Sequence, residues 1–350
     1  MNARALPKDP TRTLMYTEAA DAAAAVERQL KDNDAVVSAL GKRLQAQPPR
    51  LVVSCARGSS DHAATYAKYV IETQLGCITA SASLSVSSVY DAPQRLEGAL
   101  YLVISQSGRS SDLLRSAQAA KAAGALVVAL VNREDSPLAA IADTVIPLRA
   151  GVERSVPATK SYLAALAATL HLVARWKGDA ELLQALEAMP AALRAAFALD
   201  WSPLVQGLLT AQDMFVLGRG YGLGIAQEAA LKFKEACGLH AEAFSTAEVK
   251  HGPMALVGSG FPLLLFAQDD ATLPGSLETV REFRARGARV WTAAPGDAHP
   301  DTLPRVPAPH PLCEPLLAVQ SFYKAVNALA LARGHDPDVP PHLNKVTETV

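Results

Sequence analysis

The sequence has almost no net charge and no long hydrophobic run. Lysine and arginine number 33 and aspartate and glutamate 34 in 350 residues, which leaves no electrostatic case for binding nucleic acid or an anionic membrane surface. The longest apolar runs, such as LLLFA, are far too short to span a bilayer, and the N-terminus lacks the continuous apolar core of a signal peptide. We therefore expect a cytoplasmic protein.

Cysteine is also scarce. Cys55, Cys77, Cys237 and Cys313 are scattered, with no CxxC pair and no histidine at metal-ligand spacing. This pattern is typical of reduced, mostly buried thiols. We expect neither a disulfide nor a bound metal.

Strand-like apolar runs alternate with helical segments along most of the chain. After QPPR the order is LVVSCA, a Gly/Ser turn, a helix ending at Gly76, ALYLVISQ, a helix, GALVVALV, a helix and ADTVIPL. This alternation predicts a parallel sheet covered by helices on both faces. With right-handed crossovers, the expected fold is a doubly wound, three-layer α/β/α sandwich.

The same order repeats from Asp213 onward. The pair Arg57-Gly58 matches Arg219-Gly220, and FPLLLFAQDDAT parallels YLVISQSGRSS. We therefore predict two tandem α/β domains, over residues 49–200 and 201–335. They are preceded by an N-terminal segment (1–48) with helices over 17–30 and 35–45, and followed by a tail (336–350).

A serine-rich loop follows one of the predicted strands and precedes a helix. Open parallel sheets bind ligands at this edge, where the helix N-terminus offers unpaired N–H groups. Serine also caps helices, and composition alone supports the two roles about equally. The loop residues concerned are Ser105, Gln106, Ser107, Gly108, Ser110 and Ser111.

Two further observations favour a ligand at this loop. The turn Gly58-Ser59-Ser60-Asp61 occupies the corresponding place after the preceding strand. The second half carries AQDDAT at the place of SQSGRSS, and two aspartates there would repel a phosphate. If the loop is a phosphate site, we expect one such site per chain, in the first half.

Charged residues in the second half suggest chemistry. Glu228, Lys232 and Glu235 share one helix face at i, i+4 and i+7, and this spacing alone favours a solvent-exposed ladder of ion pairs. The alternative makes Glu235 a general base, with Lys232 placed to neutralise charge. His251 precedes Gly252-Pro253 on a turn suited to proton transfer, although a lone loop histidine is more often structural. The proline-rich tail is typical of a disordered or surface-draped segment, and its Lys345 has no role that the residues alone would suggest.

Six ordered motifs together resemble a known family. They are SCARGSSDHA, VISQSGRSSDLL, SVPATKSYLAAL, GRGYGLGIAQEAALKFKE, HAEAFSTAEVKHGPMAL and HLNKVTETV. From about residue 50 onward the chain resembles the double sugar-isomerase (SIS) domain family, as in the isomerase module of glucosamine-6-phosphate synthase. The resemblance implies two tandem SIS domains and a phosphosugar substrate, with no cofactor.

The resemblance also implies roles for individual residues. The sugar phosphate would be held by Ser105, Gln106, Ser107 and Ser110. Further contacts to the sugar would come from Gly58, Ser59, Ser60, Val156 and Ala158. Glu235 would move a proton between C1 and C2 beside Lys232 and Glu228, His251 would open the ring, and Lys345 would form an imine with the ketone. In this family the histidine comes from a neighbouring subunit, so a homodimer with a shared active site is expected.

Several positions differ from the synthase pattern. Arg109 and Ser110 replace a common Glu-Thr pair, Pro157 lies within SVPATK, and Pro341-His342 replaces Pro-Arg in the tail. We also expect no glutaminase domain. The expected activity is therefore a glucosamine-6-phosphate deaminase that forms fructose 6-phosphate and ammonia. Alternatives are an ammonia-dependent or isomerase-only relative of the synthase, another amino-sugar phosphate deaminase or deglycase, and a non-catalytic sugar-phosphate sensor.

Overall fold

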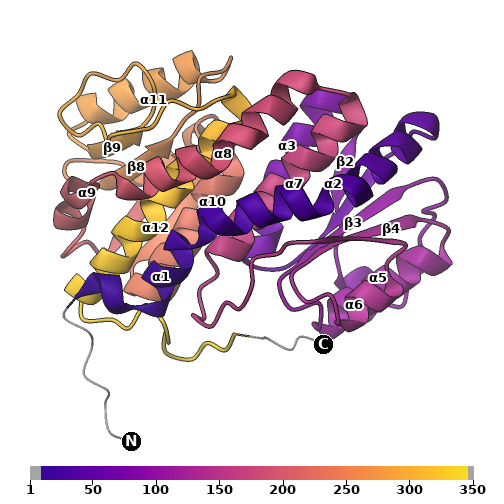
Figure 1. Cartoon of the computed structure of the whole chain (residues 1–350). Helices are drawn as coiled ribbons and strands as arrows, with labels where there is room; N and C mark the ends of the chain where they lie inside the picture. The colour runs from indigo at the N-terminus through magenta and orange to yellow at the C-terminus, as the bar shows by residue number, and fades with distance from the viewer. Residues whose placement is uncertain (1–8, 346–350) are drawn as a thin grey trace, which may run out of the picture. The chain divides into compact units, whose positions relative to one another are not determined.

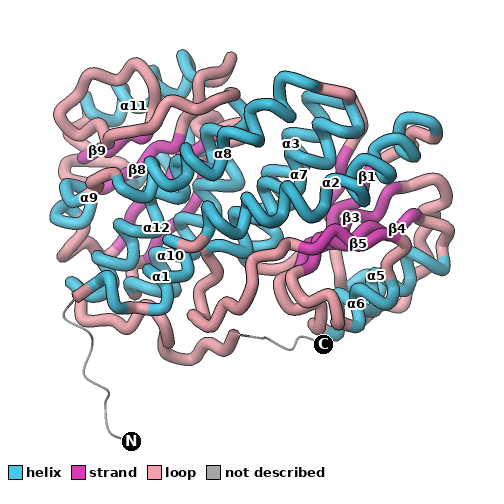
Figure 2. Tube along the Cα trace, viewed as in Figure 1, coloured by secondary structure: helices cyan, strands magenta, loops and turns pink. Residues whose placement is uncertain are grey.

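Nine strands form two fully parallel sheets in the computed structural model, which describes residues 9–345 (Figure 2). The contacts group these residues into two units. The first-sheet unit comprises residues 22–153, 160–190 and 344–345, and the second-sheet unit comprises residues 9–21, 154–159 and 191–343. The contiguous domain boundaries given by the sequence stay a prediction.

The first sheet has five strands in the order β2-β1-β3-β4-β5. Their bounds are β1 Val52–Cys55, β2 Thr79–Ser81, β3 Leu100–Ser105, β4 Leu126–Val131 and β5 Thr144–Pro147. All six residues of β3 are buried, as expected for a central parallel strand that is covered on both faces.

Helices cover both faces of the first sheet. Figure 1 shows α5 and α6 on one side of it and α2, α3 and α7 on the other. Gly76 ends α3 in the left-handed conformation that favours glycine at this position. The helices are α2 Ala22–Ala46, α3 Ser59–Leu75, α4 Ser85–Ser88, α5 Ser111–Ala122, α6 Pro137–Ile141 and α7 Lys160–Lys177.

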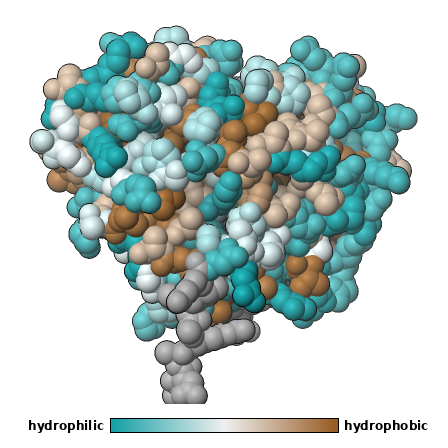
Figure 3. Space-filling model, turned by 60° about the vertical axis from the view of Figure 1, so that its left-hand side comes forward, coloured by the Kyte–Doolittle hydropathy of each residue, from teal (hydrophilic) through white to brown (hydrophobic). Residues whose placement is uncertain are grey.

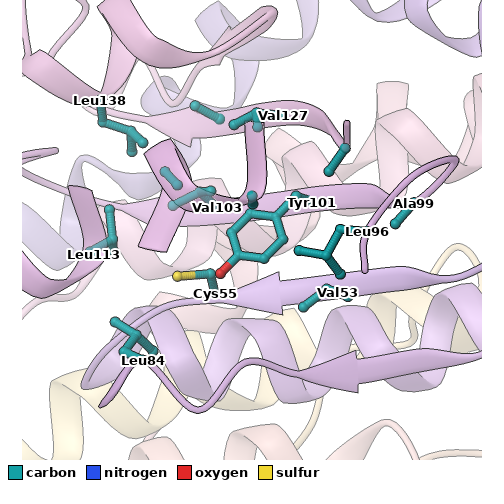
Figure 4. Packing of buried hydrophobic residues seen from close by; sticks show 14 of the residues in the cluster. Val53, Cys55, Leu84, Leu96, Ala99, Tyr101, Val103, Leu113, Val127 and Leu138 are labelled. Carbon is teal, nitrogen blue, oxygen red and sulfur yellow. The ribbon is translucent and has the colours of Figure 1, made fainter. Parts of the chain in front are cut away.

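Tyr101 of β3 lies at the centre of the core beneath α5. Figure 4 shows its ring between Val53 and Val103, with the hydroxyl directed toward Cys55. The Tyr101 hydroxyl lies 2.7 Å from the Ser116 hydroxyl, so this buried polar group has a partner. The packing fixes α5 against the sheet, and thereby fixes the loop that leads into α5.

The second sheet has four strands in the order β7-β6-β8-β9. Their bounds are β6 Asp213–Gly218, β7 His240–Ser245, β8 Pro262–Phe266 and β9 Arg289–Ala293. Figure 1 shows α11 (Leu273–Ala285) on one side of these strands and α10 (Gly222–Cys237) and α12 (Glu314–Ala332) on the other. Phe283 of α11 joins one core cluster, while Phe233 of α10 contacts Phe322 of α12 with ring centroids 5.1 Å apart.

The other α-helices are α1 Leu14–Ala20, α8 Ala180–Ala198 and α9 Ser202–Gly207. Short 3-10 helices are η1 Pro10–Arg12, η2 Glu248–His251, η3 Pro253–Leu256 and η4 Pro311–Cys313.

The predicted fold class, two tandem α/β domains that each have a parallel sheet flanked by helices, is confirmed. The two predicted N-terminal helices are wrong in their extent, because α2 runs without a break from Ala22 to Ala46. Its polar centre is used for contacts rather than for a turn: the Asn33 amide donates to the Pro147 carbonyl at 2.6 Å, and Asp34 accepts hydrogen bonds from Arg175. The sequence pattern also predicts neither edge strand, β2 nor β7, because each buries only part of its length.

The described surface is mixed in polarity. Figure 3 shows one face on which hydrophilic and hydrophobic residues are interspersed. Large apolar side chains such as Ile78 and Tyr90 are exposed. Between residues 9 and 345, no helix is long and apolar enough to cross a membrane.

Candidate functional site

The serine-rich loop connects β3 to α5 in the first-sheet unit. Ser105 is the last residue of β3, and its hydroxyl accepts a hydrogen bond from the Gly108 N–H at 3.0 Å. Gly108 has a φ of +64°, and an added Cβ would lie 2.4 Å from the Ser136 hydroxyl oxygen. The backbone therefore turns tightly here, and this position requires glycine.

The hydroxyl of Ser110 is not used to cap α5. Ser110 occupies the N-cap position with extended backbone, yet its side chain makes no capping hydrogen bond. Capping alone therefore does not explain this serine. The loop presents hydroxyls beside the first turn of a twelve-residue helix, which is the chemistry of an anion site.

A second turn lies beside this loop. Cys55, the last residue of β1, pairs with Val103 of β3, so the turn after β1 and the loop after Ser105 leave the same edge of neighbouring parallel strands, two residues apart in register. Gly58 is the N-cap of α3 with a φ of +56°, and Ser59 and Ser60 are half-buried in the first turn of the helix. The two predicted binding turns of the first half thus lie at one edge of the sheet.

An ion pair joins the two turns. The Arg57 Nη2 lies 2.7 Å and the Nε 3.0 Å from the Asp112 Oδ2. The Asp112 side chain is fully buried in the first turn of α5, whereas the Arg57 side chain is 53% exposed. The sequence motifs include both residues, but nothing in their spacing indicates that they pair.

The Lys345 ammonium forms an ion pair with a buried carboxylate of the same unit. Its Nζ is 2.9 Å from the Oε2 of Glu153, which also accepts the Ser161 hydroxyl at 2.7 Å. The Glu153 side chain has no exposed surface. Sequence reasoning does not single out Glu153, because its partner lies 192 residues away.

A charged cluster is buried on α10 in the second-sheet unit. The Lys232 Nζ lies 2.5 Å from the Glu235 Oε2 and 3.4 Å from the Glu228 Oε1, and Glu228 also accepts the Tyr323 hydroxyl at 3.1 Å. The expectation of a solvent-exposed ladder is wrong, because the Glu228 and Lys232 side chains are almost completely buried. Glu235, at 20% exposure, is the member that solvent or a ligand reaches.

The electrostatics of this cluster favour a charged lysine. Burial alone would lower the pKa of Lys232, but the carboxylates of Glu228 and Glu235 outweigh it and raise the pKa. The ammonium therefore stays protonated near neutral pH. A fixed positive charge beside a partly exposed carboxylate is suited to proton transfer near developing negative charge.

Three other candidates belong to the second-sheet unit. His251 is exposed at the end of η2, before Gly252 with a φ of +139°. Val156 and Ala158 are half-buried, and the Val156 N–H donates to the Asp338 carbonyl at 2.9 Å. The roles that the resemblance implies for all of the candidate residues stay predictions.

Among residues 9–345, no group of three or more His, Cys, Asp or Glu side chains could hold a metal ion. The four cysteines are free thiols. Burial raises the pKa of Cys55 to about 11 and that of Cys313 to about 12, so neither is a thiolate near neutral pH.

The chain is similar to known proteins in both sequence and fold. The family description "SIS domain" matches residues 47–175 and 207–293. The glutamine–fructose-6-phosphate aminotransferase (isomerizing) of Zymomonas mobilis is 32% identical over 312 residues, covering 84% of this chain and 51% of the relative. The chain thus spans about half the length of the curated relatives that it matches.

Two solved structures cover nearly the whole chain. A protein from Silicibacter pomeroyi described as a phosphosugar isomerase has a TM-score of 0.90 and 42% identity, covering 93% of this chain and all of that one. The C-terminal domain of glucosamine-fructose-6-phosphate aminotransferase from Francisella tularensis has a TM-score of 0.83 and 26% identity, covering 95% and 100%. The matched segments contain the serine loop and the α10 cluster, and the chain belongs to the SIS domain family.

Proposed function

We propose that this protein is an amino-sugar phosphate isomerase that converts glucosamine 6-phosphate into fructose 6-phosphate and ammonia. The observation that carries the proposal is the α10 cluster, in which a buried lysine lies between two carboxylates and one of these is partly exposed. A protein that only binds a sugar phosphate needs the serine loop but has no use for this cluster. The names of the relatives, which combine fructose 6-phosphate with amination and isomerisation, agree with it.

The proposed reaction begins with ring opening, assigned to His251. Glu235 then removes the proton from C2 of the open-chain amino aldehyde and returns it to C1. The electron pair of the C2–H bond forms the C1–C2 double bond of an enolamine while the C1 oxygen gains a proton. When C1 is protonated, the nitrogen loses a proton, and the product is a ketimine at C2 with a hydroxyl at C1. Lys232 stabilises the negative charge that develops on the oxygen at C1.

Ammonia leaves in the second stage. Water adds to the C2 ketimine and the C–N bond breaks, giving the ketone of fructose 6-phosphate and one ammonia. Alternatively the amine of Lys345 exchanges with the imine nitrogen, releases ammonia and is itself hydrolysed from C2. The direction we propose requires only water as a second reactant.

The test is to incubate the protein with glucosamine 6-phosphate and to measure ammonia and fructose 6-phosphate. Glu235→Gln should reduce turnover by about 10²–10⁴-fold while substrate binding persists. Glu278→Gln is the matched control, because Glu278 is an exposed helical glutamate of the same unit. If neither product forms while another sugar phosphate is isomerised, the deaminase assignment fails. If Glu235→Gln retains turnover, Glu235 is not the base.

A further inference from the structure

The Arg57–Asp112 pair has features that a purely structural pair does not need. Its carboxylate is fully buried, but its guanidinium is more than half exposed. Arginine carries five N–H donors, and Asp112 engages Nε and Nη2 through one oxygen. Within residues 9–345, Asp112 is the group to which the guanidinium is hydrogen-bonded, so donors remain for a ligand.

The ion pair places this guanidinium at the start of α5, directly after the serine loop. Arg57 follows the end of β1 by two residues, and β1 is hydrogen-bonded to β3, which ends at Ser105. Adjacent strands are about 4.8 Å apart. Asp112 draws the arginine toward the first turn of α5, the helix that begins directly after the loop.

The second half of the chain shows what happens without the carboxylate. Arg219 is the counterpart of Arg57, and Pro274 stands at the position of Asp112. Arg219 is exposed, as Arg57 is, but among residues 9–345 its side chain has no ion-pair partner. The ion pair with a carboxylate in the first turn of the following helix is therefore specific to the half that carries the serine loop.

We propose that Arg57 binds the phosphate of the substrate and that Asp112 is the positioning residue that directs it. The inference rests on the proposed sugar-phosphate substrate. Arginine matches phosphate oxygens with paired N–H donors and stays charged at every physiological pH. Hydroxyls and backbone N–H groups of the loop supply hydrogen bonds, and Arg57 supplies a fixed positive charge. Asp61, in the first turn of α3, also lies near enough to interact electrostatically with Arg57.

The test compares Arg57→Gln with Arg219→Gln by calorimetric titration. The ligands are glucosamine 6-phosphate, inorganic phosphate and unphosphorylated glucosamine. Arg57→Gln should raise the dissociation constants of both phosphate ligands by about ten- to a hundred-fold and leave that of glucosamine unchanged. Arg219→Gln should change none of them. Arg57→Lys should recover part of the loss, because it keeps the charge but not the forked donor pair.

Two outcomes would overturn the inference. In the first, Arg57→Gln binds both phosphate ligands as the parent protein does. In the second, the variant loses affinity for all three ligands equally and its melting temperature falls, as expected if the ion pair only stabilises the two turns. Asp112→Asn serves as a second variant: a positioning role predicts loss of phosphate affinity that is not additive with Arg57→Gln. If phosphate binding depends on Arg57 but no ammonia is formed from glucosamine 6-phosphate, the proposed function fails and the Arg57 site stands.

Discussion

The two halves of the chain share one pattern of elements but differ in the polar side chains at matching positions. They correspond at a constant spacing of 162 residues, as between Arg57 and Arg219 or Gln106 and Gln268. The first half has a loop with unused hydroxyls, and its helix α3 has Tyr66 and Val70 buried as core. In α10 the matching positions are Glu228 and Lys232, which belong to the buried charged cluster.

The loops after the matching strands β3 and β8 differ in the same way. In the second half, Gln268 donates to the Arg219 carbonyl, to Asp270 at 2.7 Å and to Thr272 at 3.1 Å. In the first half, Ser110 makes no capping bond, and the residue that holds the turn is Gly108. The second-half loop is hydrogen-bonded within itself, whereas the first-half loop has hydroxyls with no hydrogen-bond partner among residues 9–345. Under the proposed function, the first half would bind the substrate and the second half would carry the chemistry.

Lys232→Met should have the largest effect on the second half. It removes the positive charge between two carboxylates and leaves them buried without it, which should lower the free energy of unfolding by about 3–5 kcal/mol. Because the pKa of Lys232 is raised, this stabilisation is fully present below the unfolded lysine pKa of about 10.4. It should be lost only as the pH rises through the folded-state pKa. Urea unfolding between pH 7 and 11 measures both effects.

Lys234→Met provides the control on the same helix. Lys234 is exposed, so this substitution should leave the urea midpoint nearly unchanged. Equal midpoints for Lys232→Met and Lys234→Met would mean that the cluster contributes nothing to stability. The charged residues of α10 would then differ from the apolar residues at the matching positions of α3 without any effect on stability.

Gly108→Ala should have the next largest effect and should act on the first-half loop. Its positive φ is strained for alanine, and the new Cβ would clash with Ser136. A loss of about 1–3 kcal/mol of unfolding free energy is expected, with at least a ten-fold loss of sugar-phosphate affinity. Gly275→Ala is the matched control, because it lies in α11 with nothing within 4 Å of an added Cβ. Undiminished affinity in Gly108→Ala would show that the shape of this loop does not determine binding.

Local sequence patterns predicted the order of strands and helices. They could not predict which side chains pair across long stretches of sequence. The strand–turn–helix order around Ser105 follows from apolar runs and turn residues, because β3 is buried throughout. Tyr323, whose hydroxyl bonds Glu228, lies 95 residues away on an apolar helix. Glu153 meets Lys345 across 192 residues. The i, i+4 spacing is also the same for an exposed and a buried pair, so it could not show that Lys232 is buried.

Ser107→Ala and Gln268→Ala together test whether the two loops have separate roles. Ser107 has no hydrogen-bond partner for its hydroxyl among residues 9–345, so its loss should spare stability and weaken sugar-phosphate binding about tenfold. Gln268→Ala removes the amide group that donates to these three acceptors and should lower stability by about 1 kcal/mol without changing affinity. Calorimetric titration and urea unfolding of both variants decide the matter. The opposite assignment of effects would refute the separation of roles.

The smallest expected effect is on the free energy of unfolding, when Asp297 or its first-half counterpart, Asp135, is replaced by asparagine. Burial alone would raise the pKa of Asp297, but hydrogen bonds from Arg284 and Thr292 outweigh it and lower the pKa to about 2. Asp135 also has a lowered pKa, through a hydrogen bond from Arg133, but both of these side chains are more than half exposed. Ion pairs so exposed are screened by solvent and contribute little.

Asp297→Asn should therefore cost about 1 kcal/mol of unfolding free energy above pH 4, because its amide keeps only part of the hydrogen bonding. The stability that a depressed carboxyl pKa contributes is present above the unfolded value and lost as the pH falls through the folded value. The difference between Asp297→Asn and the parent protein should thus shrink between pH 4 and pH 2. Asp135→Asn should leave the urea midpoint unchanged throughout. A pH-independent loss in Asp297→Asn would mean that packing around the side chain, rather than its charge, stabilises the second half.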